Sequence, residues 1–199
     1  MDLQITVFLL FVLFTAGHSF SCYQCSGILG DCRGQTVATC PSGLSKCLSA
    51  TTATLIGGAS TKIMAKDCVA DCANGSMSHS TAKMSTVCCD TDQCNVQDAP
   101  DASNVPNGKK CYSCDGTSCS NIISCSGSED RCFKATVTYK DVKADIKGCF
   151  SNSLCNRPNL IPSVSDVSCC EGNLCNGAQS VTHSFQFLCC SLLSFVLLH

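Results

Sequence analysis

The sequence predicts an all-β, disulfide-rich fold built from two copies of one small domain, and three observations lead to this prediction. The 199 residues include 22 cysteines, a density typical of a disulfide scaffold. The same ten-cysteine pattern occurs twice along the chain. The segments with the clearest hydropathy pattern alternate polar and apolar residues, which is the period of a half-buried β-strand.

The apolar content of the middle of the chain shows why cross-links are needed. Between Phe20 and Asn176, Leu, Ile, Val and Phe make up only 26 of 157 residues, less than the ~20% that a chain normally needs to fold on apolar burial. Disulfides must therefore supply stability that the core lacks. This composition excludes a large α/β enzyme, and the formal net charge of −2 gives no reason to expect a nucleic-acid partner.

The N-terminal residues 1–19 are predicted to be a secretory signal peptide. An apolar stretch runs from Ile5 to Phe14, and the small residues Gly17 and Ser19 occupy the −3 and −1 positions for cleavage before Phe20. The alternative is a membrane-spanning helix, which requires ~20 apolar residues. The apolar stretch is too short for that, so we expect the chain to enter the secretory pathway.

The C-terminal residues 177–199 are predicted to be the propeptide of a glycosylphosphatidylinositol (GPI) attachment signal. A triplet of small residues begins at Asn176, a polar spacer follows, and the apolar tail runs from Phe187 to Leu198. Asn176 is the expected attachment residue, with Gly177 and Ala178 as alternatives. A buried terminal helix or strand is the competing interpretation. The signal predicts a protein on the extracellular face of the plasma membrane.

The twenty cysteines between these ends divide into two sets of ten. Each set opens with Cys-x-x-Cys next to a tyrosine and closes with Cys-Cys-x4-Cys-Asn, so the middle of the chain is an internal duplication. The predicted organisation is domain 1 at residues 20–95, a polar linker at 96–110 and domain 2 at 111–176. Hundreds of pairings are open to ten cysteines, although adjacent cysteines such as Cys88 and Cys89 should bond to different partners.

Zinc binding is the other interpretation of a Cys-x-x-Cys pair. An oxidising compartment and an even number of cysteines favour disulfides instead. We therefore expect neither a metal nor any other cofactor.

The pattern Cys-x-x-Cys … Cys-Cys-x4-Cys-Asn resembles the three-finger domain of the urokinase-receptor and lymphocyte-antigen-6 superfamily, over essentially all of residues 20–176. The resemblance implies two tandem three-finger, snake-toxin-like domains, each with a disulfide knot from which three β-loops extend. It gives Asn95 and Asn176, which follow the last cysteine of each set, a hydrogen-bonding role in the knot. The bridges it implies are Cys22–Cys47, Cys25–Cys32, Cys40–Cys68, Cys72–Cys88, Cys89–Cys94, Cys111–Cys132, Cys114–Cys119, Cys125–Cys149, Cys155–Cys169 and Cys170–Cys175.

The histidines give no support to an enzyme. His79 is the only histidine between the two ends, and it lies in a polar segment expected to be a solvated loop, whereas His183 falls in the predicted spacer. The middle of the chain also lacks Gly-x-Ser-x-Gly and His-Glu-x-x-His motifs. We expect no catalysis.

The candidate partner-binding surface is the middle hairpin of domain 2. Residues 133–140 and 142–148 both alternate with period two, which predicts two strands of one hairpin. The simpler interpretation is that its lysines only solvate the outer face. The sharper hypothesis is a strip that binds an acidic protein partner, with Tyr139 as an anchor. The strip consists of Lys134, Tyr139, Lys140, Lys143 and Lys147.

The corresponding segment of domain 1, residues 48–66, is rich in Thr and Ala around Gly57-Gly58 and alternates weakly. It is therefore the poorer candidate for a contact surface. Asn74 begins a glycosylation sequon and is expected to be exposed.

These features predict a GPI-anchored surface protein of the receptor or adhesion type, which recognises an extracellular protein through its finger loops. Two alternatives remain open. One is a secreted two-domain inhibitor resembling the gamma-type phospholipase inhibitors, and the other is a toxin-like modulator of ion channels or acetylcholine receptors. The apolar tail Phe187–Leu198 distinguishes the anchored protein from the inhibitor, which has no need for it.

Overall fold

The computed structural model describes residues 19–28, 32–56, 59–140, 142–155, 157 and 164–177. The predicted signal peptide up to residue 18 and the spacer and tail from residue 178 onward lie outside this part. The described residues form two compact units. The first unit runs to Asn74 and includes Ser85–Asp101, and the second consists of Gly75–Met84 and the chain from Ala102 onward. Both are built from strands and disulfides, which confirms the predicted all-β fold class.

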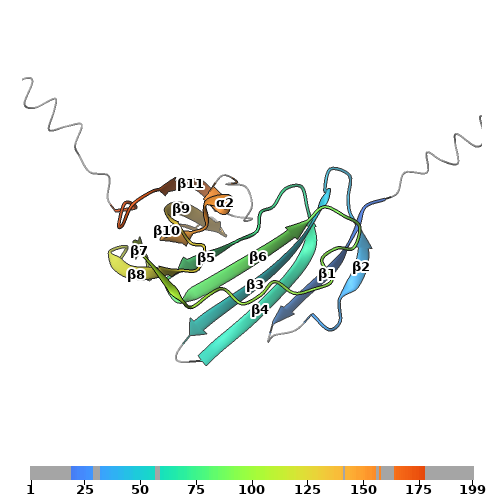
Figure 1. Ribbon diagram of the computed structural model, residues 1–199, viewed down its shortest axis with the longest axis horizontal. Coiled ribbons are helices and arrows are strands. Elements are labelled where there is room, and N and C mark those ends of the chain that lie inside the picture. The colour runs from blue at the N-terminus through green and yellow to red at the C-terminus, as the bar shows by residue number, and fades with distance from the viewer. Residues whose placement is uncertain are drawn as a thin grey trace, which may run out of the picture. The chain divides into compact units, whose positions relative to one another are not determined.

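The first unit is a sheet with the strand order β6-β3-β4-β1-β2. Its central hairpin is fully paired, from Lys46↔Val69 at its base to Ile56↔Ala59 at its tip, and is visible in Figure 1 as the two long arrows β3 and β4. Strand β6 enters this unit at Ser85. The strands are β1 (Ser21–Ile28), β2 (Thr36–Thr39), β3 (Lys46–Ile56), β4 (Ala59–Val69) and β6 (Ala82–Cys89).

One face of the β3–β4 hairpin is buried although its residues are mostly polar. Ser49, Thr51, Met64 and Lys66 alternate with exposed or half-buried neighbours along the two strands, as expected for strands with one covered face. The weak hydropathy alternation of this segment therefore arises because, apart from Met64, the buried side chains named here are hydroxyls and one ammonium group. Such groups need hydrogen-bond partners inside the protein.

The segment Val96–Asp101 supplies those partners and covers this face of the first unit. Main-chain carbonyls at residues 97 and 99 accept hydrogen bonds from the hydroxyls of Ser49 and Thr51, at 3.0 and 2.6 Å. The Lys66 ammonium donates to the Val96 carbonyl at 2.6 Å and forms an ion pair with Asp98 at 3.0 Å. This segment begins the stretch that the sequence assigns to a linker, and in the structure it is held against the sheet.

The second unit contains a sheet with the order β11-β9-β10-β5 and a separate hairpin of β7 and β8. Strand β7 begins at Pro106, so the last residues of the predicted linker belong to a strand. Strands β9 and β10 are paired without interruption from Arg131↔Phe150 to Tyr139↔Val142. The elements are β5 (Gly75–His79), β7 (Pro106–Ser113), β8 (Asn121–Ser126), β9 (Arg131–Tyr139), β10 (Val142–Phe150), α2 (Asn152–Cys155) and β11 (Val164–Cys170).

Strand β5 is the unexpected member of this sheet, because it comes from domain 1 of the predicted organisation. It pairs antiparallel to β10 at Ser78↔Cys149 and Met77↔Phe150. Gly148 allows this close approach, since a Cβ atom built there would collide with the Ser78 carbonyl oxygen and lie 2.9 Å from the Phe133 ring. The hairpin Gly75–Met84 is therefore an integral part of the second unit.

The cores of both units consist largely of disulfide sulfur. In the first unit the buried cluster is Cys22, Cys40, Cys47 and Cys68. In the second it is Cys111, Cys125, Cys132 and Cys149. The second unit adds an aromatic pair, Phe133 and Phe150, whose rings stack at 3.9 Å and are almost fully buried. Few apolar side chains contribute besides these, in agreement with the composition.

Candidate binding surface

The disulfide knots hold the fingers of each unit in place. The structure contains Cys22–Cys47, Cys25–Cys32, Cys40–Cys68, Cys72–Cys88, Cys89–Cys94, Cys111–Cys132, Cys114–Cys119, Cys125–Cys149, Cys155–Cys169 and Cys170–Cys175. These are the pairs that the family resemblance implies. The two central bridges of each knot lie against each other, with sulfurs of different bridges 3.4 Å apart in the first unit and 3.3 Å apart in the second.

Asn95 joins two strands within the first knot. Its side-chain oxygen accepts a hydrogen bond from the Tyr23 amide at 2.9 Å. Its side-chain amide group donates to the carbonyls of Tyr23 and Leu48, at 2.9 and 3.1 Å. The side chain is buried, and all three main-chain partners would otherwise lose water without gaining a replacement.

Asn176 repeats this arrangement in the second knot. It accepts from the Tyr112 amide at 2.9 Å and donates to the carbonyls of Tyr112 and Phe133, at 2.9 and 2.8 Å. In each unit the partners are the tyrosine beside the first cysteine and the residue that follows the fifth. The sequence duplication therefore extends to individual hydrogen bonds.

The predicted lysine strip lies on the β9–β10 hairpin, and the structure places its members in different environments. The register sets Lys134 opposite Lys147 and Lys143 opposite Thr138 on one face. Lys134 is half-exposed and lies 3.7 Å from the Asp145 carboxylate. Lys147 departs from the expected strip because it is only 9% exposed. Strand alternation identifies the face of a residue, but not the element that covers that face.

The exposed part of the strip is the tip of the hairpin, where Lys140 and Lys143 flank Val142. Both lysines are exposed, and Val142 is 67% exposed. Of Tyr139 only the main chain is described, so its predicted anchoring role lies outside the described side chains. The tip thus presents an apolar side chain between two ammonium groups, which is a suitable contact for a partner with an apolar and acidic surface.

The hairpin tip of the first unit has a different chemistry. Leu55 of β3 is 53% exposed, and no charged residue occurs between it and Thr61 in the sequence. The two middle fingers therefore offer two different surfaces, one uncharged and one basic.

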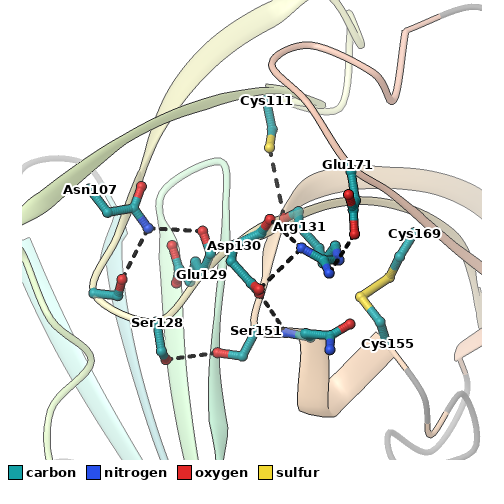
Figure 2. Close-up of polar contacts among 12 residues, drawn as sticks. Asn107, Cys111, Ser128, Glu129, Asp130, Arg131, Ser151, Cys155, Cys169 and Glu171 are labelled. Carbon is teal, nitrogen blue, oxygen red and sulfur yellow. Dashed lines mark hydrogen bonds and ion pairs between the residues drawn. A yellow bond between two sulfur atoms is a disulfide. The ribbon is translucent and has the colours of Figure 1, made fainter.

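A buried polar cluster surrounds Glu129 in the loop that joins β8 to β9 (Figure 2). The carboxylate is 1% exposed and accepts hydrogen bonds from the Ser78 hydroxyl at 2.7 Å and the Ser126 amide at 2.9 Å. The Asn107 side-chain amide donates to the Glu129 main-chain carbonyl at 2.9 Å. Burial raises the pKa of Glu129, opposed by the hydrogen bonds from Ser78 and Ser126 and by the charge of Lys83. Sequence reasoning missed this residue, because a single Glu in a turn carries no signal of burial.

Figure 2 also shows how this loop continues into β9. Arg131 forms ion pairs with Asp130 at 3.1 Å and with Glu171 at 2.7 Å. The Ser128 and Ser151 hydroxyls are hydrogen-bonded at 2.9 Å. These contacts brace the loop on both sides of Glu129.

His79 occupies the end of β5, where the sequence suggested a solvated loop. It is half-buried, and its Nδ1 atom is enclosed without a hydrogen-bond partner among the described residues. Burial lowers the pKa of His79. The serine-rich segment that ends at His79 is therefore a paired strand, β5, and its polar sequence gave no sign of this.

Two groups of three cysteine sulfurs lie within the spacing of a metal site, with ligand atoms inside 4.8 Å of one another. Each of these sulfurs is bonded to another sulfur, and a disulfide sulfur is not a thiolate ligand. The described cysteines thus form cross-links and cannot offer the thiolates that zinc requires.

A family model described as "Snake toxin and toxin-like protein" matches residues 20–95 and 110–176 and so covers both repeats. The chain belongs to this family. The membership confirms the resemblance to the urokinase-receptor and lymphocyte-antigen-6 superfamily and the tandem three-finger fold.

Relatives in this family include receptors of the cell surface. The urokinase plasminogen activator surface receptor of Aotus trivirgatus is 33% identical over 111 residues, covering 48% of this chain and 33% of the receptor. That of Bos taurus is 34% identical over 103 residues, covering 45% and 31%. This three-finger chain spans about a third of the length of the curated relatives it matches. The crystal structure of mouse TEX101 covers 76% of this chain and 96% of its own, at 19% identity and a TM-score of 0.33.

Proposed function

We propose that this three-finger protein is displayed on the outer face of the plasma membrane by a GPI lipid and recognises a protein partner through its finger tips, without catalysis. The observation that carries the proposal is the β9–β10 hairpin, a fully paired two-stranded finger that ends in an exposed Val142 between Lys140 and Lys143. A rigid finger loses little conformational entropy on binding. The matched relatives are named as surface receptors, which supports the proposal that this protein acts at the cell surface.

The proposed anchor is consistent with the geometry at the end of the second knot. The side-chain amide of Asn176 is held by Tyr112 and Phe133, and a GPI lipid is joined to a main-chain carboxyl group. Attachment at Asn176, or at the alternatives Gly177 and Ala178, therefore leaves the knot intact. Across the described residues, the helical content offers no segment with the length and hydropathy of a membrane span.

Treating intact expressing cells with a phosphatidylinositol-specific phospholipase tests the anchor. We expect the enzyme to release the protein into the medium. A chain that ends at Gly177 is the control, and it should be secreted without treatment. Wild-type protein that is free in the medium before treatment would instead support a secreted inhibitor resembling the gamma-type phospholipase inhibitors.

Substitution of the exposed tip tests the binding surface. A fluorescent tetramer of residues 20–177 is titrated on a panel of cell lines, and its saturable binding is compared with that of Val142→Ser and Lys143→Ala variants. Each should weaken binding five- to thirtyfold, which corresponds to about 1–2 kcal/mol for a contact residue. Val105→Ser is the matched control, since Val105 is 73% exposed and precedes β7. If Leu55→Ser weakens binding and Val142→Ser does not, the contact surface is the finger of the first unit.

A further inference from the structure

The Gly75–Met84 hairpin is held in the second unit mainly by polar contacts. Ser76 exchanges two hydrogen bonds with Ser151: its amide donates to the Ser151 hydroxyl at 2.9 Å, and its carbonyl accepts from the Ser151 amide at 3.0 Å. Two positions further, the Ser78 hydroxyl donates to Glu129. The Ser80 amide donates to the Ser113 hydroxyl at 2.7 Å. Alternate residues of the hairpin thus face the second unit, each with a hydrogen bond.

A contact made mainly of hydrogen bonds, such as that between this hairpin and the rest of the second unit, costs less free energy to open than a well-packed apolar contact. Water replaces each hydrogen bond when the hairpin leaves, so the net contribution of one bond is only about 0.5–1.5 kcal/mol. The ladder between β5 and β10 has two registered pairs, whereas β9 and β10 are paired along their whole length. The hairpin is therefore attached to β10 by a much shorter ladder than the one that joins β9 to β10.

Glu129 is an acidic side chain at the centre of this contact. It lies between Ser78 of the hairpin and Ser126 of β8 and is almost completely buried. Opening the hairpin removes the Ser78 bond and admits water to the carboxylate. The charged form of Glu129 gains most from that change, because water solvates a carboxylate better than a buried site does.

The other ionisable groups around the contact are few. Lys83, on β6 within the hairpin, places its ammonium 3.0–3.2 Å from the Ser103 carbonyl, Asn104 and the Ser126 hydroxyl, and its charge favours ionised Glu129. Arg131 at the start of β9 is engaged by Asp130 and Glu171. Lys147 is buried in β10. His79 is the second titratable group on the hairpin itself, and its enclosed Nδ1 disfavours the imidazolium.

We propose that the Gly75–Met84 hairpin is a releasable latch of the second unit, which is tightened when Glu129 takes up a proton and loosened when His79 takes up a proton. Protonation of the two groups has opposite effects on the latch, because burial favours the neutral form of each side chain. Glu129 is neutral when it is protonated, whereas His79 is neutral when it is deprotonated.

Each sign follows from comparing the docked with the released hairpin. The pKa of Glu129 is raised above its ordinary value of 4.5 in the docked state. Its contribution to docking is therefore complete below pH 4.5 and is lost as the pH rises through the docked-state pKa. The pKa of His79 is lowered from 6.5. Its contribution is present above pH 6.5 and is lost as the pH falls through the docked-state pKa.

Hydrogen exchange of the full-length chain, produced in mammalian cells, measures the latch directly. Exchange of the amides of Gly75–Met84 is followed by mass spectrometry from pH 5 to pH 8 and corrected for the intrinsic rate at each pH. In His79→Gln the opening constant should fall on acidification, by up to about tenfold per pH unit, because only Glu129 remains. In Glu129→Gln it should rise below about pH 6.5, because only His79 remains.

Asp166→Asn is the matched control, because it neutralises an exposed carboxylate on β11 of the same unit and should leave the wild-type profile unchanged. His79→Asn serves if His79→Gln fails to fold. Amides of β9 should not share the pH dependence, which separates local opening from global unfolding. A Glu129→Gln profile identical to that of the wild-type protein would overturn the proposal, as would equal pH dependence in β5 and β9.

Discussion

Asn95 and Asn176 connect separate strands at the knots through one side chain each. Each asparagine satisfies three main-chain groups from two strands, using its oxygen as an acceptor and its nitrogen as a double donor. An aspartate at this position would lack both donors, and a leucine would lack all three bonds. The geometry explains why an asparagine follows the last cysteine of both repeats.

Replacing Asn95 by alanine should destabilise the protein substantially. The change leaves the amide and carbonyl of Tyr23 and the carbonyl of Leu48 without their partner, and each unsatisfied buried group costs about 1–3 kcal/mol. We expect a loss of at least about 2 kcal/mol and a fall in Tm of about 8–16 °C, measured by circular dichroism. Asn152→Ala removes an exposed asparagine and serves as the control. Equal melting temperatures for the two variants would contradict this account.

Strand β5 shows how a secondary-structure element of one repeat can be completed by the other. The serine-rich segment has no apolar periodicity, but the edge of β10 and the polar cluster around Glu129 supply partners for its main chain and hydroxyls. The segment Val96–Asp101 behaves similarly toward β3 and β4, where it pairs with the buried Lys66 through Asp98. In both elements the partners determine the conformation, while local propensity contributes little.

Gly148 should be the most sensitive glycine of the second unit. An alanine methyl group at this position collides with the Ser78 carbonyl and presses on Phe133, and such overpacking costs about 1–3 kcal/mol. We therefore expect Gly148→Ala to lower the Tm and to increase hydrogen exchange in Gly75–Met84. Gly34→Ala is the control, because a Cβ atom there has no neighbour within 4 Å. Unchanged exchange in the Gly148→Ala hairpin would rule out the close approach of β5 to β10.

At the scale of the whole molecule, each unit has a core of paired sulfurs, with a small apolar contribution. The four-cysteine clusters are fully or almost fully buried, and Phe133 and Phe150 are the largest apolar additions in the second unit. Stability should therefore depend on which bridge is removed, through both the length of the loop that it closes and the burial of its sulfurs.

Removing the Cys125–Cys149 bridge should cost more than removing the Cys114–Cys119 bridge. The first closes a separation of 24 residues and the second a separation of 5. Loop entropy alone gives a difference of about 1.4 kcal/mol, and the first pair is also completely buried. Paired Cys→Ser variants compared by thermal unfolding and secretion yield test this order. A C114S/C119S variant that is less stable than C125S/C149S would show that core burial is not the main contribution.

Much of the fold follows from the sequence because its signals are local and repeated. Ten cysteines in the same order specify the duplication, and strict alternation over residues 133–148 places the β9–β10 hairpin correctly. The exposure of individual side chains on that hairpin does not follow. Val142 is exposed and Lys147 is buried, because the cover over a strand comes from elements distant in the chain.

The cysteine spacing, through its resemblance to a known family, was enough to predict two cross-linked three-finger domains, and the family membership confirms them. The terminal apolar segments add the prediction of a secreted, anchored protein. Packing, by contrast, is what places Gly75–Met84 in the second unit, lays Val96–Asp101 against the first and encloses Glu129. Disulfides and strand periodicity can be predicted from residue types and from the spacing of those residues along the sequence. Burial of a polar group depends on which distant groups come to satisfy it, and that is settled when the chain packs.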